Sequence, residues 1–306
     1  MLFVFLVVFI IYSFIFVFII HQLAGTGNTN DLTTIKSIGS VTGDSVGAAV
    51  GAAIGSITAN PIGLVLGASA GGLVGSLINT VSDDYSSRVL SQKEKERVSD
   101  VLALATKEID ANLDKGLVAR EDFFCEDSSS AVADELLEGT LKKAQEEYEN
   151  KKIPFLAKLY ANLVFHPEVS PTLANSLIRI MSDLSYRQLE IISVLGLLTV
   201  FEDSCGPLRK DERPATINGL DNIGLAVDIY DLHNRGLVHS SELITSIVNI
   251  VPSALSINGL GMLLYQLAEL MRMKKDDQLD DIMRYFTGEQ YEAMIVKCYP
   301  HLDENR

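Results

Sequence analysis

Glycine recurs at every fourth position in two runs between residues 39 and 75, and this ladder constrains the fold more than any other feature of the chain. Residues four apart share one face of a helix, so each run presents a stripe without side chains that another backbone can approach closely. In water each such glycine would cost a helix roughly 0.5–1 kcal/mol relative to alanine. In a bilayer the stripe supports tight packing, because van der Waals contact there replaces hydrophobic burial between helices. We therefore expect a membrane packing interface made of Gly39, Gly43, Gly47, Gly51, Gly55, Gly63, Gly67, Gly71 and Gly75.

The segment before the ladder is apolar. Residues 1–20 contain no charged side chain, and at about 1.5 Å per residue they span the hydrocarbon core of a bilayer, which is about 30 Å thick. We expect a transmembrane helix over residues 1–22. A cleaved secretory signal is the alternative, but the basic n-region is missing, the apolar stretch is too long, and no small-x-small cleavage site follows directly.

The ladder itself predicts a helical hairpin over residues 38–80. Its two arms, residues 42–58 and 62–78, are separated by a break that contains Pro61. Proline fits the first position of a helix because its missing N–H would have no partner there. Each arm is about 17 residues long, at the low end for spanning a bilayer. Constitutive and conditional insertion both remain open.

Almost all charged residues come after residue 86. Of the 25 basic and 40 acidic residues of the chain, only Lys36 and four aspartates precede that point. The remainder is long enough for one core or two small ones, and its negative charge disfavours nucleic acid as a partner. A basic cluster follows the hairpin at Arg88, Lys93, Lys95 and Arg97. The positive-inside tendency therefore predicts that the C-terminal domain is cytoplasmic.

Residues 86–201 have the pattern of a helical domain, with apolar residues spaced by three or four. The segments expected to be helical are 93–113, 131–150, 155–165, 172–184 and 185–201. Pro154 marks a new helix start, and Ser185 with Gln188 has the spacing of a capping box. The charged run at residues 146–152 is interpreted as a solvated face at the end of a helix.

Residues 215–306 are expected to form a winged-helix-like unit and C-terminal helices. A helix over residues 221–233 ends before Gly236, and residues 237–238 read as a short extended piece. Residues 243–251 are apolar and β-branched, and the pattern fits either a strand or a short helix. The helix contains no Lys or Arg, so we expect a protein-contact or structural role rather than DNA binding. The fold class predicted for the whole chain is mainly α.

The cysteines and histidines do not form a metal-site or redox pattern. Cys125, Cys205 and Cys298 are far apart and form no C-x-x-C pair. His233 and His239 are near neighbours but lack the i, i+4 spacing of a metal site. We expect no metal and no cofactor.

Other catalytic patterns are equally weak. Gly259 and Gly261 form a G-x-G, but a third glycine and a preceding strand signature are missing, which disfavours a dinucleotide site. An enzyme that uses acids such as Asp183, Glu190 or Asp228 is a third function class. Isolated carboxylates on helices are usually solvated or capping groups, so we expect no enzymatic activity and no catalytic residues.

Four segments occur in an order that resembles the abortive-infection alpha (Abi-alpha) group of bacterial proteins. They are KIPFLAKLYAN at residues 152–162, LIRIMSDLS at 177–185, DIYDLHNRGLV at 228–238 and LSINGLG at 255–261. The resemblance covers residues 130–270 and implies a mainly helical fold with a winged-helix-like end. It also implies a bacterial role in antiviral defence, by stopping or killing the infected cell. This chain departs from the group in carrying membrane segments at its amino terminus.

Two main function classes follow. In the first, the protein is an antiphage effector of the bacterial inner membrane that self-associates through the glycine-zipper hairpin and perturbs the bilayer. Its partners would be lipid, further copies of the chain, and a protein or infection signal at the cytosolic domain. In the second, residues 1–80 passively anchor an interaction module whose partner carries the activity.

Overall fold

A computed structural model describes most of the chain after residue 87. The described residues are 88–120, 132–200, 220–274 and 276–288. They belong to one compact unit and are mainly helical, as predicted. The transmembrane helix expected at residues 1–22 and the hairpin expected at residues 38–80, with all nine ladder glycines, lie outside them and stay predictions. Of the helices that the structure describes, none is both long and apolar enough to cross a membrane.

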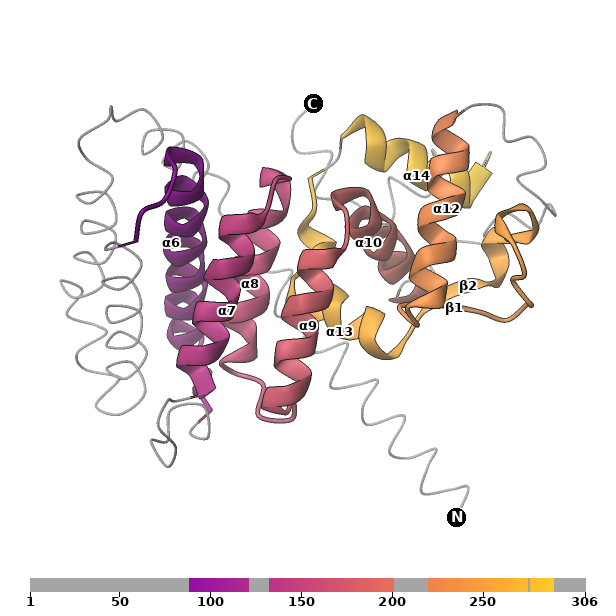
Figure 1. Ribbon diagram of the computed structural model, residues 1–306. Coiled ribbons are helices and arrows are strands. Elements are labelled where there is room, and N and C mark those ends of the chain that lie inside the picture. Colours follow the sequence, from indigo (N-terminus) through magenta and orange to yellow (C-terminus); the bar gives the residue numbers. More distant parts are fainter. Residues whose placement is uncertain (1–87, 121–131, 201–219, 275, 289–306) are drawn as a thin grey trace, which may run out of the picture. The chain divides into compact units, whose positions relative to one another are not determined.

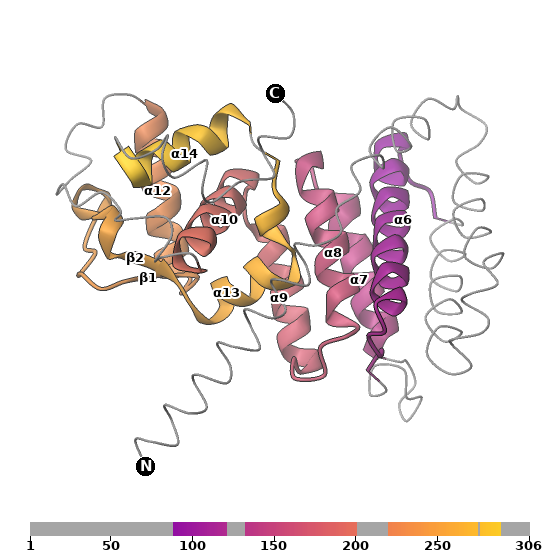
Figure 2. The same ribbon diagram turned by 180° about the vertical axis from the view of Figure 1, so that it is seen from behind.

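Four helices form the first part of the described chain, and both views show them side by side (Figures 1 and 2). They are α6 (Gln92–Asp114), α7 (Val132–Glu146), α8 (Ile153–Leu163) and α9 (Pro171–Asp183). Helix α8 is apolar on most of its surface and contacts α6, α7 and α9. These helices match the expected segments, except that α7 ends at Glu146 rather than near residue 150.

Local capping explains where these helices begin. The Ser91 side chain accepts the N–H of Glu94, and the Glu94 carboxylate accepts the N–H of Ser91, which is a capping box at the start of α6. The Ser170 hydroxyl accepts the N–H of Leu173, while Pro171 occupies the first turn of α9. At the N-termini of α6 and α9, the capping side chains therefore accept N–H groups that have no partner within the helix.

Helix α10 (Tyr186–Val200) is the centre of the second part. Twelve of its 15 residues are buried, because it contacts α12 (Leu220–Asn234), α13 (Gly259–Leu267) and α14 (Asp277–Thr287). Figures 1 and 2 show these three helices around it. A helix buried on nearly all sides needs no polar face, and most of the buried residues of α10 are apolar.

Two short strands follow α12. Strands β1 (Val238–Ser240) and β2 (Leu255–Ile257) pair antiparallel, with His239 opposite Ser256. The loop between them contains the 3-10 turns η4 (Ile247–Asn249) and η5 (Pro252–Ala254), so the undecided segment at residues 243–251 is a loop with one such turn and no strand. Two more turns, η3 (Asn150–Lys152) and η6 (Leu270–Arg272), lie elsewhere.

A close backbone contact positions α13. A Cβ on Gly261 would lie 2.0 Å from the carbonyl oxygen of Leu237, so only glycine fits where α13 passes the start of β1. Gly259, two residues earlier, has a positive φ of 50° at the start of α13. The G-x-G that could suggest a nucleotide loop therefore has a packing and turn role.

Candidate functional site

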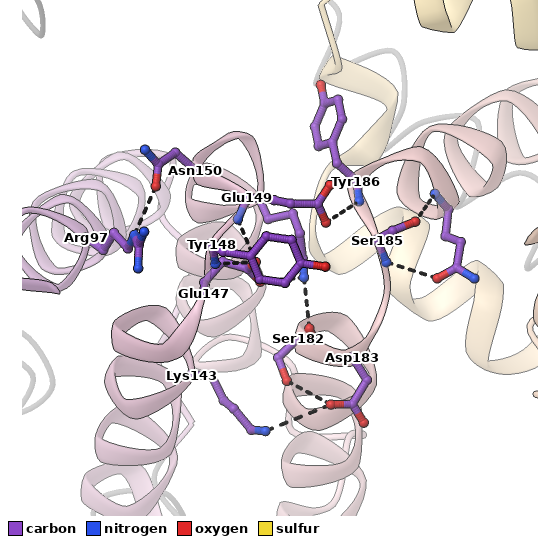
Figure 3. Close-up of polar contacts among 12 residues, drawn as sticks. Arg97, Lys143, Glu147, Tyr148, Glu149, Asn150, Ser182, Asp183, Ser185 and Tyr186 are labelled. Carbon is purple, nitrogen blue, oxygen red and sulfur yellow. Dashed lines mark hydrogen bonds and ion pairs between the residues drawn. The ribbon is translucent and has the colours of Figure 1, made fainter. Parts of the chain in front are cut away.

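A buried ion pair lies where α7, η3, α9 and α10 meet, in the cluster that Figure 3 shows. The Lys152 ammonium contacts the Glu147 carboxylate, and both side chains are withdrawn from water, with exposed fractions of 4% and 5%. Lys152 also donates a hydrogen bond of 2.8 Å to the carbonyl oxygen of Ser182, a residue in the last turn of α9. One carboxylate oxygen of Glu147 accepts the N–H groups of Tyr148 and Glu149, both at 2.9 Å. Every charge in the pair thus has additional hydrogen-bond partners, as burial requires.

The polar contacts continue to the first turn of α10. The Glu149 carboxylate accepts the N–H of Tyr186 at 3.0 Å. The Ser185 N–H donates to the Gln188 side chain at 3.0 Å, and the Gln188 N–H donates to the Ser185 hydroxyl at 3.2 Å. This confirms the predicted capping box. The first N–H groups of α10 are therefore satisfied partly by a side chain from the α7–α8 connection.

Three further contacts attach the connection and the end of α7 to α6 and α9. Arg97 on α6 donates to the Asn150 side chain at 3.0 Å and to the carbonyl oxygen of Gln145 at 3.3 Å. Lys143 lies 3.9 Å from Asp183 in a partly exposed pair. We call the whole set the polar junction. Figure 3 labels ten of its members, which are Arg97, Lys143, Glu147, Tyr148, Glu149, Asn150, Ser182, Asp183, Ser185 and Tyr186. Gln145, Lys152 and Gln188 complete the set through the contacts given above.

The junction corrects one prediction. The charged run at residues 146–152 was interpreted as a solvated face, but Glu147 and Lys152 are buried. The reason is local geometry, because α7 ends at Glu146 and the next helix begins at Ile153 with Pro154 in its first turn. The intervening residues reverse the chain direction and turn two charges inward. The nearby proline was the signal that could have argued against a continuous exposed helix.

The junction extends to α14 through Lys151. Its ammonium lies 2.8 Å from a carboxylate oxygen of Asp276 and 4.9 Å from the centroid of the Tyr186 ring. The other oxygen of Asp276 accepts the N–H of Leu279 and caps α14. Lys151 therefore connects the α7–α8 connection to the N-terminus of α14 and the first turn of α10.

The structure does not bring the three candidate acids together. Asp183 lies at the end of α9 beside Lys143, whereas Asp228 on α12 is paired with Arg187. Glu190 is fully buried on α10, so the expectation that such acids are solvated or capping groups was wrong for it. The three acids have separate environments and form no shared acid–base arrangement.

The histidines and cysteines considered as metal ligands either have a structural role or lie outside the described part of the chain. A ring nitrogen of His233 lies 3.2 Å from the carbonyl oxygen of Val238, while His239 is on β1. Within residues 88–120, 132–200, 220–274 and 276–288, His, Cys, Asp and Glu form no group of three that could hold a metal. All three cysteines lie outside these ranges. The polar junction can position helices, and its charges are held by protein groups.

Comparison with known proteins gives a family match for the amino-terminal region. A family model described as YMGG-like Gly-zipper matches residues 8–83, a range that contains the whole ladder. No curated protein and no solved structure matches the chain. The match covers less than half of the chain, and it shows that this region is similar to a glycine zipper.

Proposed function

We propose that this protein is a bacterial antiphage effector anchored in the inner membrane. Its glycine-zipper hairpins pack between several protomers and perturb the bilayer when the cytoplasmic helical domain receives an infection signal. The single observation that carries the proposal is the Gly-zipper match over residues 8–83, because it coincides with the ladder on which close helix packing depends. The resemblance of residues 130–270 to the abortive-infection alpha group adds the defence role.

The helical domain supports a signal-receiving role through protein contacts. Helix α12 followed by the β1–β2 pair has the order of a helix and wing, yet the described part of α12 carries acids and no Lys or Arg. A helix without Lys or Arg offers no cation to a nucleic-acid backbone. Two apolar side chains of α12, Ile223 and Val227, are exposed one turn apart, and such residues favour a protein partner. The domain is proposed to act without catalysis.

Expression in bacteria tests the proposal. Induced full-length chain should reduce colony counts and collapse the membrane potential, as read by a potential-sensitive dye. A shortened chain that lacks residues 1–80 should be harmless at equal protein level. If the full chain localises to the membrane but leaves both growth and potential unchanged during phage infection, the passive-anchor function is correct instead.

A further inference from the structure

Glu190 is an ionisable group in an unusual place. It lies in the first half of α10 with an exposed fraction of 0%. Neither of its carboxylate oxygens makes a hydrogen bond of normal length and angle with a described residue, although the side chains of Asp276 and Gln278 lie near enough to interact with the carboxylate. A buried carboxylate without hydrogen bonds is unfavourable, and such a group responds by keeping its proton. The neutral acid is therefore the form that suits this packing.

The groups around Glu190 come from α14 and η3. Asp276 and Gln278 at the start of α14 lie close enough to influence its ionisation, and within the described part of the chain Lys151 from η3 is the cation that does so. The Lys151 ammonium already forms an ion pair with the Asp276 carboxylate at 2.8 Å. Ionised Glu190 would thus place two carboxylates beside one ammonium group.

The other elements packed against α10 hold their charges in separate pairs. On α12, Asp228 binds Arg187 and Asp231 accepts from Gln188. On the η6 side, Arg272 pairs with Glu269. Further titratable or charged groups in these elements are Tyr186 on α10 itself, Tyr230 and His233 on α12, Tyr265 on α13, and Asp277, Asp280, Asp281, Arg284 and Tyr285 on α14. Strand β2 contributes only Leu255, Ser256 and Ile257.

We propose that α14 is held on α10 by a proton-dependent clasp, in which neutral Glu190 lies beneath the Lys151–Asp276 ion pair and loss of its proton releases α14. Burial, and then the Asp276 charge, raise the pKa of Glu190 from 4.5 to about 8. In the released state Glu190 returns to water and to its ordinary pKa. Closed α14 therefore binds one more proton than released α14 between these two pKa values, and its release becomes easier as pH rises through that window.

The sign and size of the effect follow from this linkage. The equilibrium constant for release should grow by roughly tenfold per pH unit up to pH 8, because one proton is lost on release. Above pH 8 Glu190 is ionised in both states, so the constant should level off. The clasp does not depend on the proposed membrane activity.

Hydrogen exchange measured by mass spectrometry on the full chain in detergent tests the clasp. Exchange of the α14 amides, corrected for the intrinsic pH dependence of exchange, should accelerate about tenfold per pH unit from pH 6 to 8. In Glu190→Gln the corrected rate should stay flat. Asp276→Asn, which keeps a capping side chain, should also flatten it, because Lys151 then neutralises ionised Glu190. The matched control Asp183→Asn should behave as the wild type.

Two results would overturn the clasp. One is a wild-type α14 rate that, after correction, does not change with pH while α6 amides remain protected. The other is an equally steep pH dependence in Glu190→Gln. If Glu190→Gln does not fold, as judged by loss of α6 protection at pH 6, Asp276→Asn alone decides: a flat profile supports the clasp and a wild-type profile refutes it.

Discussion

Glu147 and Lys152, five residues apart in the connection between α7 and α8, form an ion pair that is almost completely buried. Their remaining hydrogen bonds go to the backbone of the connection and to the end of α9. The pair therefore fixes both the reversal of the chain and the position of α9 against it. Its importance for stability can be measured directly.

Removing one member of this pair should destabilise the domain strongly. In Lys152→Met the carboxylate of Glu147 stays buried without its cation, which costs about 3–5 kcal/mol of unfolding free energy. Glu147→Gln should cost a similar amount, and the double variant less than the sum of the two. Urea unfolding followed by far-UV circular dichroism measures all three.

The matched control is Lys143→Met. Lys143 pairs with Asp183 at 3.9 Å in a partly exposed position, so its loss should change the unfolding free energy by less than about 1 kcal/mol. Equal effects of the Lys143 and Lys152 substitutions would contradict the assignment of the buried pair as the dominant contact.

A second prediction concerns the close approach of α13 to β1. Gly261→Ala would force its Cβ to within 2.0 Å of the Leu237 carbonyl oxygen, and we expect a loss of about 1–3 kcal/mol from the backbone shift. Gly139→Ala on α7 is the control, because its Cβ would have no atom within 4 Å. That substitution should stabilise the chain by roughly 0.5–1 kcal/mol through helix propensity. Thermal unfolding midpoints that move in the same direction for both variants would refute the packing role of Gly261.

The helices were predictable because their signals are local. The Ser185–Gln188 capping box, the proline that begins α8 and the glycine after α12 each act within a few residues, and each lies where the sequence placed it. The burial of Glu190 was not predictable, since it depends on α14, which lies far along the chain. The fit of Gly261 against Leu237 likewise depends on the tertiary packing of α13. The prediction that the charged run at residues 146–152 is solvated failed for the same reason. A run of charges has the pattern of a solvated segment, and its burial depends on residues distant in the sequence.

The pH dependence of stability should carry the signature of Glu190. Its pKa is raised from 4.5 to about 8, so the folded state holds a proton that the unfolded state has already lost between these values. The unfolding free energy of the wild type relative to Glu190→Gln should therefore fall with rising pH, by up to about 1.4 kcal/mol per unit, and become constant above pH 8. Urea titrations of both proteins at pH 5, 7 and 9 measure the difference. A wild-type stability that rises with pH relative to Glu190→Gln would have the wrong sign for this assignment.

The predicted membrane orientation rests on the basic cluster at Arg88, Lys93, Lys95 and Arg97. A reporter fused after Arg306 should fold and function in the cytoplasm, because these cations keep the adjoining domain on that side. The full chain should sediment with the inner membrane and need detergent for release. Reporter activity in the periplasm would contradict the orientation, and a full chain that is soluble without detergent would contradict the anchor.

The central claim is that the glycine ladder packs helices between protomers, and one pair of double variants tests it most directly. Gly47→Leu with Gly51→Leu makes the first arm more apolar and a better helix former, so a simple anchor would hold the membrane as well or better. If the arms pack through the glycine face, two leucine side chains on that face keep the backbones apart. Val46→Leu with Val50→Leu places the same side chains on a neighbouring face and serves as the control.

The measurement is chemical crosslinking of the membrane-embedded full chain, with colony counts from the same cultures. We predict that the glycine variant remains in the membrane but loses both its crosslinked oligomers and its toxicity, while the valine variant keeps both. Equal oligomerisation and equal toxicity in the two double variants would show that the ladder has no packing role and would contradict the proposed function.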